Sequence, residues 1–370
     1  MRNGHIQQAM MYIEDHLNES ISRSELADIA GINPDHFSRM FKKQTGISPK
    51  EYITRLRMER AKSLLAKSPS SIMEVARSVG FEDPYHFSRR FKQVVGVAPS
   101  AYMASPQLRV VALDGYGHCL ALGVVPVAAD AKPIGQYVPW MKEVEVLSLS
   151  GEREMDRERL ATLKPDIIIT MNRHDEQELA EIAPVVFLDV LEDPIYGQLV
   201  KLAAALGKEA QAAQWIQDYE ERCHMLKMQL AKDGQSRRVA ILRVREPLLQ
   251  IYGMQNMGYP FYRSLKVVPP ERILLQTVCN VHFHSSAISM EEIGFYEADE
   301  LFVVVQPEEG ARRRWKELQA SPSLCSHPAY RSGRIYELDV SRWLAYDPIS
   351  IRFQMEEAAG LLLSGAHMPE

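Results

Sequence analysis

One short motif occurs twice in the first hundred residues, and this repeat limits the folds open to that segment. The stretch HFSRMFKKQTGISPKEY begins at His36, and HFSRRFKQVVGVAPSAY begins at His86. The copies align at an offset of 50 residues, whereas Gly31 and Gly80, which precede them, align at an offset of 49. A repeat with one residue inserted in a turn predicts two similar small units in tandem.

Helix signals predict about seven short helices in residues 1–103, with a longer one near residues 49–66. Ser-x-x-Glu at residues 22–25, 48–51 and 71–74 has the spacing of a capping box, which opens a helix. Gly31 and Gly80 stand where helices should end. Each copy therefore has the pattern helix, tight turn, helix. This is the helix-turn-helix pattern, whose second helix enters the major groove of DNA.

The second helix of each copy is predicted to have an apolar and a polar face. Phe37 and Phe41, like Phe87 and Phe91, recur at helical spacing on the apolar face. A polar helix face is most often only solvated, but the recurrence of Ser-Arg in both copies favours a nucleic-acid contact. The polar candidates are Asp35, Ser38, Arg39 and Lys42 in the first copy, and Tyr85, Ser88, Arg89 and Lys92 in the second.

Side-chain chemistry suggests different roles for these polar candidates. Arg39 and Arg89 each have the fork that binds guanine O6 and N7. The serines and lysines are better suited to phosphate or mixed contacts. His36 and His86 precede a buried Phe, so packing, phosphate contact and base reading stay open for them.

Residues 5–103 resemble the DNA-binding domain of AraC/XylS-type transcription regulators. The resemblance rests on ELADIAGINPDHFSRMFKKQTGISPKEYI, the linking helix RLRMERAKSLLAKS, and SIMEVARSVGFEDPYHFSRRFKQVVGVAPSAYM. It implies that the two second helices enter successive major-groove turns, about 34 Å apart. It also implies base contacts at Asp35, Ser38, Arg39, Tyr85, His86 and Arg89. Asp35 departs from the usual chemistry, and we expect it to affect sequence preference more than affinity.

The pattern changes after residue 103, and a domain boundary is predicted near residues 104–107, giving domains 1–104 and 107–370. Apolar runs at 109–113, 166–170, 184–190, 238–244, 248–253, 300–306 and 334–340 alternate with amphipathic segments. This alternation predicts an α/β architecture with mostly parallel sheets. Residues 207–233 predict one long helix between two lobes. The predicted fold class is therefore multidomain: an all-α double helix-turn-helix domain, then a two-lobed α/β domain.

Ligands of such α/β folds bind beyond the carboxyl ends of the strands. In RRVAILRVRE, Arg243 and Arg245 share one face at a strand end and suggest an anion cradle. The alternative is a surface ion pair with Glu246. Aromatic walls and polar contacts are possible from residues that singly are more typical of core or surface: Tyr137, Trp140, Tyr252, Gln255, Tyr259, His282, His284 and Trp343.

Residues 108–363 resemble class III periplasmic substrate-binding proteins of the ferric-siderophore and cobalamin type. The matching phrases include RVVALDGYGHCLALGVVPV, LATLKPDIII and WKELQASPSLCSHPAYRSGRIYELDVSRW. The resemblance implies two lobes, a rigid joining helix, and a basic cluster that neutralises an anionic ferric chelate. Arg243 and Arg245 suit that cluster, and Arg173 would complete it from the other lobe. The combination resembles regulators of siderophore uptake that sense a bacillibactin-type chelate.

Charge and composition agree with a DNA-binding part joined to a different sensing part. Residues 1–103 carry 15 Lys/Arg against 11 Asp/Glu, and the rest carries 28 against 37. A basic first part and an acidic second part indicate that only the first meets a polyanion. Four scattered cysteines, no run of eighteen apolar residues and no signal-peptide pattern lead us to expect a cytoplasmic protein with reduced thiols.

These observations predict a transcription regulator, an activator of siderophore uptake genes, controlled by a ferric siderophore between the lobes. The expected partners are operator DNA, an anionic ferric siderophore and RNA polymerase, with a homodimer on DNA possible. The iron stays with its chelator, so no intrinsic cofactor and no protein metal ligands are expected. Three alternatives stay open: haem, cobalamin or ferric citrate as effector; a siderophore-processing enzyme, although no G-x-S-x-G motif occurs; and lobes that bind no ligand.

Overall fold

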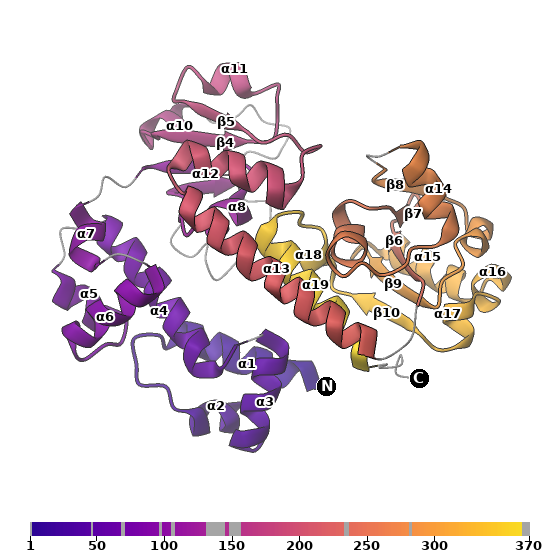
Figure 1. Ribbon diagram of the computed structural model, residues 1–370, viewed down its shortest axis with the longest axis horizontal. Coiled ribbons are helices and arrows are strands. Elements are labelled where there is room, and N and C mark those ends of the chain that lie inside the picture. The colour runs from indigo at the N-terminus through magenta and orange to yellow at the C-terminus, as the bar shows by residue number, and fades with distance from the viewer. Residues whose placement is uncertain are drawn as a thin grey trace. The chain divides into compact units, whose positions relative to one another are not determined.

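The computed structural model of the chain divides into two compact units, Met1–Arg109 and Val110–Glu370 (Figure 1). It describes residues 2–45, 47–67, 71–95, 98–104, 108–130, 145–147, 157–232, 237–280 and 283–364. Of the predicted boundary, residues 105–107 lie outside the described residues. None of the helices described in these ranges has the length and apolar character needed to cross a membrane.

The described part of the first unit is all helical, as predicted, and the predicted longer helix is α4. The helices are α1 (Arg2–Asp15), α2 (Arg23–Ile29), α3 (Pro34–Thr45), α4 (Pro49–Lys67), α5 (Ile72–Ser78), α6 (Pro84–Val95) and α7 (Pro99–Ala104). The capping boxes that open α2 and α5 form in full, from Ser22 with Glu25 and from Ser71 with Glu74. At α4, Ser48 Oγ accepts from the Glu51 N–H at 3.2 Å.

Two helix-turn-helix units, α2–α3 and α5–α6, are built alike. Gly31 and Gly80 end the first helix of each unit with φ of 63° and 78°, a left-handed conformation that suits glycine. The paired phenylalanines of α3 and α6 are fully buried: Phe37, Phe41, Phe87 and Phe91. Because these rings occupy the core, the opposite faces of α3 and α6 are left to solvent.

The second unit begins with an N-terminal lobe built on a parallel sheet of order β3-β2-β1-β4-β5. Its elements are β1 (Val110–Ala112), α8 (Tyr116–Ala121), β2 (Ala128–Asp130), β3 (Glu145–Leu147), α10 (Arg157–Thr162), β4 (Ile167–Thr170), α11 (Glu176–Leu179) and β5 (Val185–Phe187). The short segment η2 (Pro194–Leu199) and α12 (Val200–Leu206) then lead to α13 (Glu209–Lys232).

The C-terminal lobe has a mixed sheet of order β10-β9-β6-β7-β8, in which β7 and β8 are antiparallel to their neighbours. Its strands are β6 (Val239–Val244), β7 (Leu249–Tyr252), β8 (Ser285–Ile288), β9 (Glu300–Val305) and β10 (Ile335–Leu338). Its helical segments are η3 (Asn256–Gly258), η4 (Tyr259–Ser264), α14 (Glu271–Cys279), η5 (Glu291–Phe295), α15 (Glu309–Gln319), α16 (Pro322–Cys325), α17 (Pro328–Arg331), α18 (Val340–Trp343) and α19 (Pro348–Ser364).

The predicted α/β class is confirmed, and so is the long helix, which is α13. Helix α13 runs between the two lobes and packs on α19, α12 and α8 (Figure 1). One hydrophobic core includes residues of both sheets, such as Ile169 and Ile241, together with Tyr219 of α13. Strands β2, β3 and β8 were not predicted, because each is short and has little of the apolar character that marks a strand.

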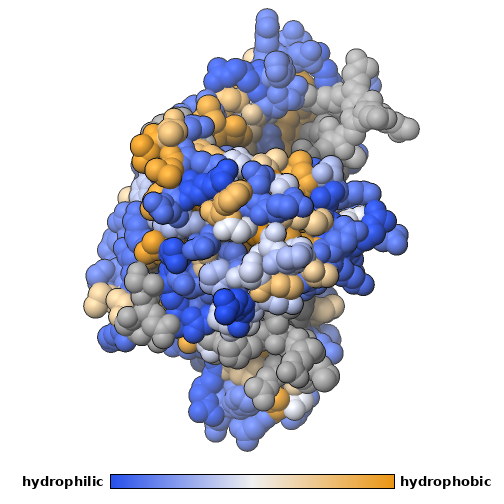
Figure 2. All heavy atoms as spheres, turned by 90° about the vertical axis from the view of Figure 1, so that its right-hand side faces the viewer, coloured by the Kyte–Doolittle hydropathy of each residue, from blue (hydrophilic) through white to orange (hydrophobic). Residues whose placement is uncertain are grey.

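The surface shown in Figure 2 is mostly hydrophilic, with hydrophobic side chains in small groups. Among the described residues, exposed apolar side chains occur on α14 at Leu275 (60 % exposed) and Val278 (82 %), and on η5 at Phe295 (62 %). A limited number of exposed apolar side chains is ordinary on a protein surface in contact with water.

Candidate DNA-binding and ligand-binding sites

The solvent face of α3 and α6 presents the predicted DNA contacts. Arg39, Lys42, Arg89 and Lys92 are exposed, and Tyr85 is 82 % exposed. Each arginine lies two residues after a buried Phe, which fixes the orientation of its helix. The two helices therefore offer matched arginine and lysine positions, an arrangement suited to reading a major groove.

Ser38 and Ser88 are half-buried and bind their own helices. The Ser38 hydroxyl donates to the Pro34 carbonyl at 3.0 Å, and the Ser88 hydroxyl donates to the Pro84 carbonyl at 2.8 Å. Phosphate oxygens are acceptors, so a phosphate contact needs the serine proton. Each hydroxyl would have to leave its carbonyl to make the phosphate contact considered in the sequence analysis.

The Asp35 carboxylate on α3 is paired with a cation from α2. Arg23 Nη1 lies 3.1 Å from Asp35 Oδ1, and both side chains are exposed. This pair balances the charge of a carboxylate on the face that is predicted to meet DNA. The helix-turn-helix unit α5–α6 has Tyr85 at the position that Asp35 holds in α2–α3, so the two helix-turn-helix units present different chemistry there. Sequence reasoning did not find Arg23, because its partner lies one helix away.

His86 is exposed next to the Phe81 ring, with ring centroids 5.6 Å apart in an edge-on arrangement. Its backbone N–H donates to the Asp83 carboxylate at 3.2 Å at the start of α6. His86 therefore has a packing contact on one side and solvent on the other.

A polar cluster forms around Arg243 where β6 and β9 end. Arg243 Nη1 lies 3.4 Å from Tyr252 Oη. The Gln306 side-chain amide faces the same guanidinium, and with its oxygen turned inward it accepts from Nη2 at 2.5 Å and from Nε at 2.9 Å. The ring of His284 lies 5.2 Å from that of Tyr252. Sequence reasoning did not select Gln306, although it directly follows β9 and the strand-end rule applies to it.

The Arg243 charge has no carboxylate partner among the described residues, and the same holds for Arg245. Burial, followed by the nearby Arg243 charge, lowers the pKa of His284 and favours its neutral form. The end of β6 is thus electropositive, as an anion site requires.

Glu246, the alternative partner of Arg245, lies elsewhere. A Cβ at Gly310 would meet the Glu246 Cδ atom at 2.3 Å, so the carboxylate lies over the first turn of α15. A carboxylate is favourable at a helix amino end because of the helix dipole. In addition, Arg314 Nε donates to the Glu246 carbonyl at 2.9 Å. The Arg245–Glu246 ion pair considered from the sequence does not form.

In the N-terminal lobe, Arg173 follows β4 and is the third predicted anion contact. Its guanidinium lies 4.3 Å from the centroid of the Phe187 ring and 3.7 Å from Asp189 Oδ2. The side chain is 69 % exposed. Arg173 is therefore accessible, but it already has an acidic neighbour.

Trp343 and Tyr259, two further predicted ligand contacts, bond to residues other than Arg243. Trp343 is fully buried, stacks on Phe261 and donates from Nε1 to Glu357 at 2.7 Å. Gln255 is half-buried and precedes η3. Tyr259 is buried and lies near the opposite end of β6, because β7 is antiparallel and the chain turns back. Tyr137, Trp140 and His282 lie outside the described residues.

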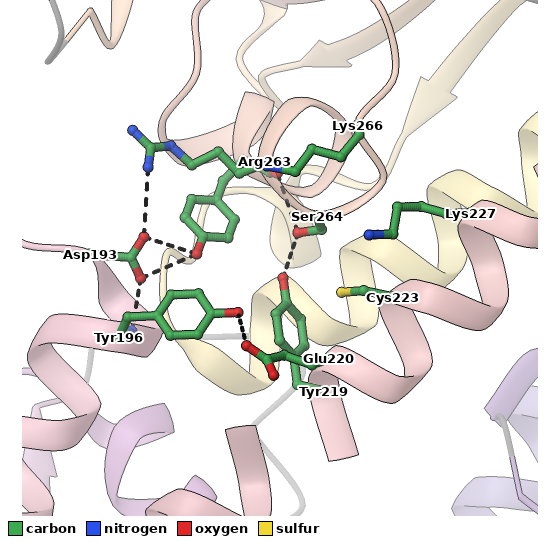
Figure 3. A pocket seen from close by; sticks show the side chains of 10 residues that line it. Asp193, Tyr196, Tyr219, Glu220, Cys223, Lys227, Arg263, Ser264 and Lys266 are labelled. Atoms are coloured by element: carbon green, nitrogen blue, oxygen red, sulfur yellow. Dashed lines mark hydrogen bonds and ion pairs between the residues drawn. The ribbon is translucent and has the colours of Figure 1, made fainter. Parts of the chain in front are cut away.

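Tyr259 belongs to a pocket of about 340 Å³ beside α13 (Figure 3). Asp193 accepts hydrogen bonds from Tyr259 Oη at 2.9 Å and from the Ile195 and Tyr196 N–H groups at 2.9 Å. Tyr219 Oη and Ser264 Oγ are 2.5 Å apart. Burial and the Asp193 charge raise the pKa of Tyr259, so its hydroxyl remains a donor.

The bond between Tyr259 and Asp193 joins the lobes, because Asp193 follows β5 whereas Tyr259 begins η4. Replacing Tyr259 with Phe should lower the free energy of unfolding by about 1 kcal/mol, since one hydrogen bond to Asp193 is lost. Urea unfolding of the full-length chain measures this change. Tyr330→Phe, at a residue that is 39 % exposed, is the matched control and should have little effect. Equal stability of the Tyr259 variant and the unchanged protein would contradict the role of this bond.

Within the described part of the chain, no three His, Cys, Asp or Glu side chains come together as metal ligands. His118, in α8, is fully buried, and burial lowers its pKa to about 4. It is therefore a neutral core residue.

Comparison with known families identifies the class of protein. A helix-turn-helix domain family matches residues 26–105, and a periplasmic binding protein family matches residues 111–341. The resemblances expected from the sequence are thereby confirmed. Together they define a DNA-binding transcription regulator of the AraC type joined to a binding-protein domain.

A relative matches nearly the whole chain. The HTH-type transcriptional activator Btr of Bacillus subtilis is 30 % identical over 372 residues, which are 96 % of this chain and 68 % of the relative. This chain belongs to the family of helix-turn-helix regulators that includes Btr. The lactose operon transcription activator of Staphylococcus xylosus is 36 % identical over 81 residues, 22 % of this chain and 29 % of that protein.

Solved structures resemble the second unit. Unliganded FhuD2 of Staphylococcus aureus has a TM-score of 0.60 at 21 % identity and covers 70 % of this chain and 99 % of its own. SirA of the same organism, complexed with staphyloferrin B, has a TM-score of 0.61 at 22 % identity and covers 69 % of this chain and 92 % of its own. At these identities the likeness establishes the fold.

Proposed function

We propose that this protein activates siderophore uptake genes when a ferric siderophore binds between the lobes of its second unit. The main support is Arg243 at the end of β6, which has no carboxylate partner among the described residues, with Arg245 two residues on. Among the described residues, Gln306 and Tyr252 engage three of the five Arg243 N–H donors. Two donors are left for an anion, and the side chain is held in place.

Ligand class follows from this chemistry. Guanidinium groups bind carboxylate, phosphate and catecholate oxygens through paired hydrogen bonds. An anionic ferric chelate presents several such oxygens, and Arg173 would contribute from the N-terminal lobe. The iron would remain with the chelator, so the proposal requires no intrinsic cofactor and no protein metal ligand.

Control of DNA binding would arise from differential affinity. A chelate that binds one lobe arrangement more tightly shifts the population towards that arrangement. This shift would change how the two recognition helices are presented, and it couples two distinct sites. The proposed site of action is the cytoplasm, with RNA polymerase as partner and a homodimer on DNA.

A titration of full-length protein with a ferric catecholate chelate tests the effector, with tryptophan fluorescence and operator affinity as readouts. We expect saturable binding and a change in operator affinity. Haem, cobalamin and ferric citrate are the comparison ligands. A response to one of these alone would assign the effector to another class, and no response to any would contradict ligand control.

The proposal includes no catalytic step. Mass spectrometry of the chelate after incubation with purified protein checks this directly. We expect the chelate to be recovered unchanged, and its hydrolysis would instead identify a siderophore-processing enzyme.

A further inference from the structure

Arg57 lies in α4, the helix that links the two helix-turn-helix units, and it bonds both to the segment that leads into α2–α3 and to the turn within α5–α6. Its Nε donates to the Leu17 carbonyl at 2.9 Å, and its Nη2 donates to the Glu19 carbonyl. Both carbonyls lie between α1 and α2, just before the helix-turn-helix unit α2–α3. Its Nη1 donates to the Gly80 carbonyl at 3.0 Å, in the turn of the helix-turn-helix unit α5–α6.

The helix-turn-helix unit α5–α6 also packs on this guanidinium. The Arg57 Cζ atom lies 5.6 Å from the centroid of the Phe81 ring, which is a cation–π contact. Burial lowers the pKa of Arg57. Placing a guanidinium in such surroundings is unfavourable unless its donors find partners, and three carbonyls accept from three of its five N–H donors here.

The turn between α5 and α6 and the segment between α1 and α2 approach each other closely at this point. A Cβ at Gly80 would lie 2.7 Å from Arg57 Nη2 and 2.7 Å from the Leu17 carbonyl oxygen. Glycine is therefore required there by space as well as by its φ of 78°. The backbone of the turn between α5 and α6 therefore lies against the backbone of the segment between α1 and α2, with the guanidinium beside both.

We propose that Arg57 is a positioning residue that sets the spacing and relative orientation of recognition helices α3 and α6. It bonds to the segment before α2, which leads through α2 to α3, and to the turn directly before α6, so it ties the two helix-turn-helix units together at these points. The planar fork of a guanidinium reaches three carbonyls in fixed directions, and a lysine ammonium cannot reproduce that geometry.

The consequence for DNA binding follows from the physics of linked binding modules. Two modules held at the correct separation bind as one, because the second contact is made at high effective concentration. A looser connection lowers this effective concentration and tolerates more separations. Arg57 should therefore determine which spacing between half-sites the protein prefers.

The test uses operator duplexes selected from random DNA by the full-length protein, and versions with one base pair inserted or deleted between the half-sites. Arg57→Lys and Arg57→Met should each lose about tenfold or more in affinity for the selected spacing. Their preference among the three spacings should become flatter, while affinity for a duplex with one half-site stays unchanged. Arg55→Met is the matched control, because Arg55 is on the same helix and pairs only with Glu51 at 3.0 Å among described residues.

Two results would overturn the proposal. One is a spacing preference as sharp in both Arg57 variants as in the unchanged protein. The other is an equal loss of affinity for duplexes with a single half-site, which would show that the substitution damages one helix-turn-helix unit and not the link between the two. The inference rests on DNA binding itself, so failure of the unchanged protein to select any duplex would instead contradict the proposed function.

Discussion

Replacing Arg243 and Arg245 together with Ala is expected to abolish the response to a ferric catecholate chelate and to leave operator binding by the free protein intact. Removing one partner of a desolvated charge pair costs roughly 2–5 kcal/mol, which is about 30-fold to several thousandfold in affinity. Neither arginine has a carboxylate partner in the described part of the chain, so the substitution breaks no observed ion pair. Fluorescence titration and operator affinity measure the two effects separately.

The control for this experiment is the double variant Arg238→Ala, Arg331→Ala. It removes two positive charges from the same lobe, but at the amino end of β6 and before β10. Arg238 lies 3.9 Å from Asp299, a surface pair of small energetic value. The control should keep chelate affinity. Chelate binding that survives the loss of Arg243 and Arg245 would show that the ligand site lies elsewhere.

Replacing Arg39 or Arg89 with Ala should each cost roughly 1–3 kcal/mol of operator binding, and the loss should be confined to particular base pairs. Both side chains are exposed on helices held by two fully buried phenylalanines, so the substitutions should not disturb the fold. Affinities for a set of single-base variants of the operator measure the effect. At the base that the arginine reads, the variant protein should no longer discriminate.

Arg90→Ala is the matched control for Arg89. Arg90 is the next residue of α6, is half-buried, and donates to Gln93 Oε1 at 2.6 Å. Its replacement should leave the ranking of base variants unchanged. If the loss in the Arg39 or Arg89 variant is the same for every sequence, that arginine contacts phosphate and not a base.

Much of the fold could be predicted because its signals are local. Capping boxes, the glycines of the turns and the spacing of buried phenylalanines act within a few residues, so the repeat was sufficient to predict α2–α3 and α5–α6. Strands β6 and β9 are mostly apolar runs and were found for the same reason. Strand β8, with the sequence SSAI, carries no such signal, because it is defined by its pairing with β7.

The chain's sequence by itself determined the two helix-turn-helix units, the α/β class of the second part and the arginines at the end of β6. Only the tertiary structure decided which side chains meet. It placed Gln306 on Arg243, Glu246 over α15 and not beside Arg245, and Tyr259 and Trp343 away from the arginines. It also placed Arg57 between Leu17 and Gly80, which are 40 and 23 residues away from it in the chain. Contacts of this range depend on how elements pack, and helix or strand periodicity carries no information about that packing.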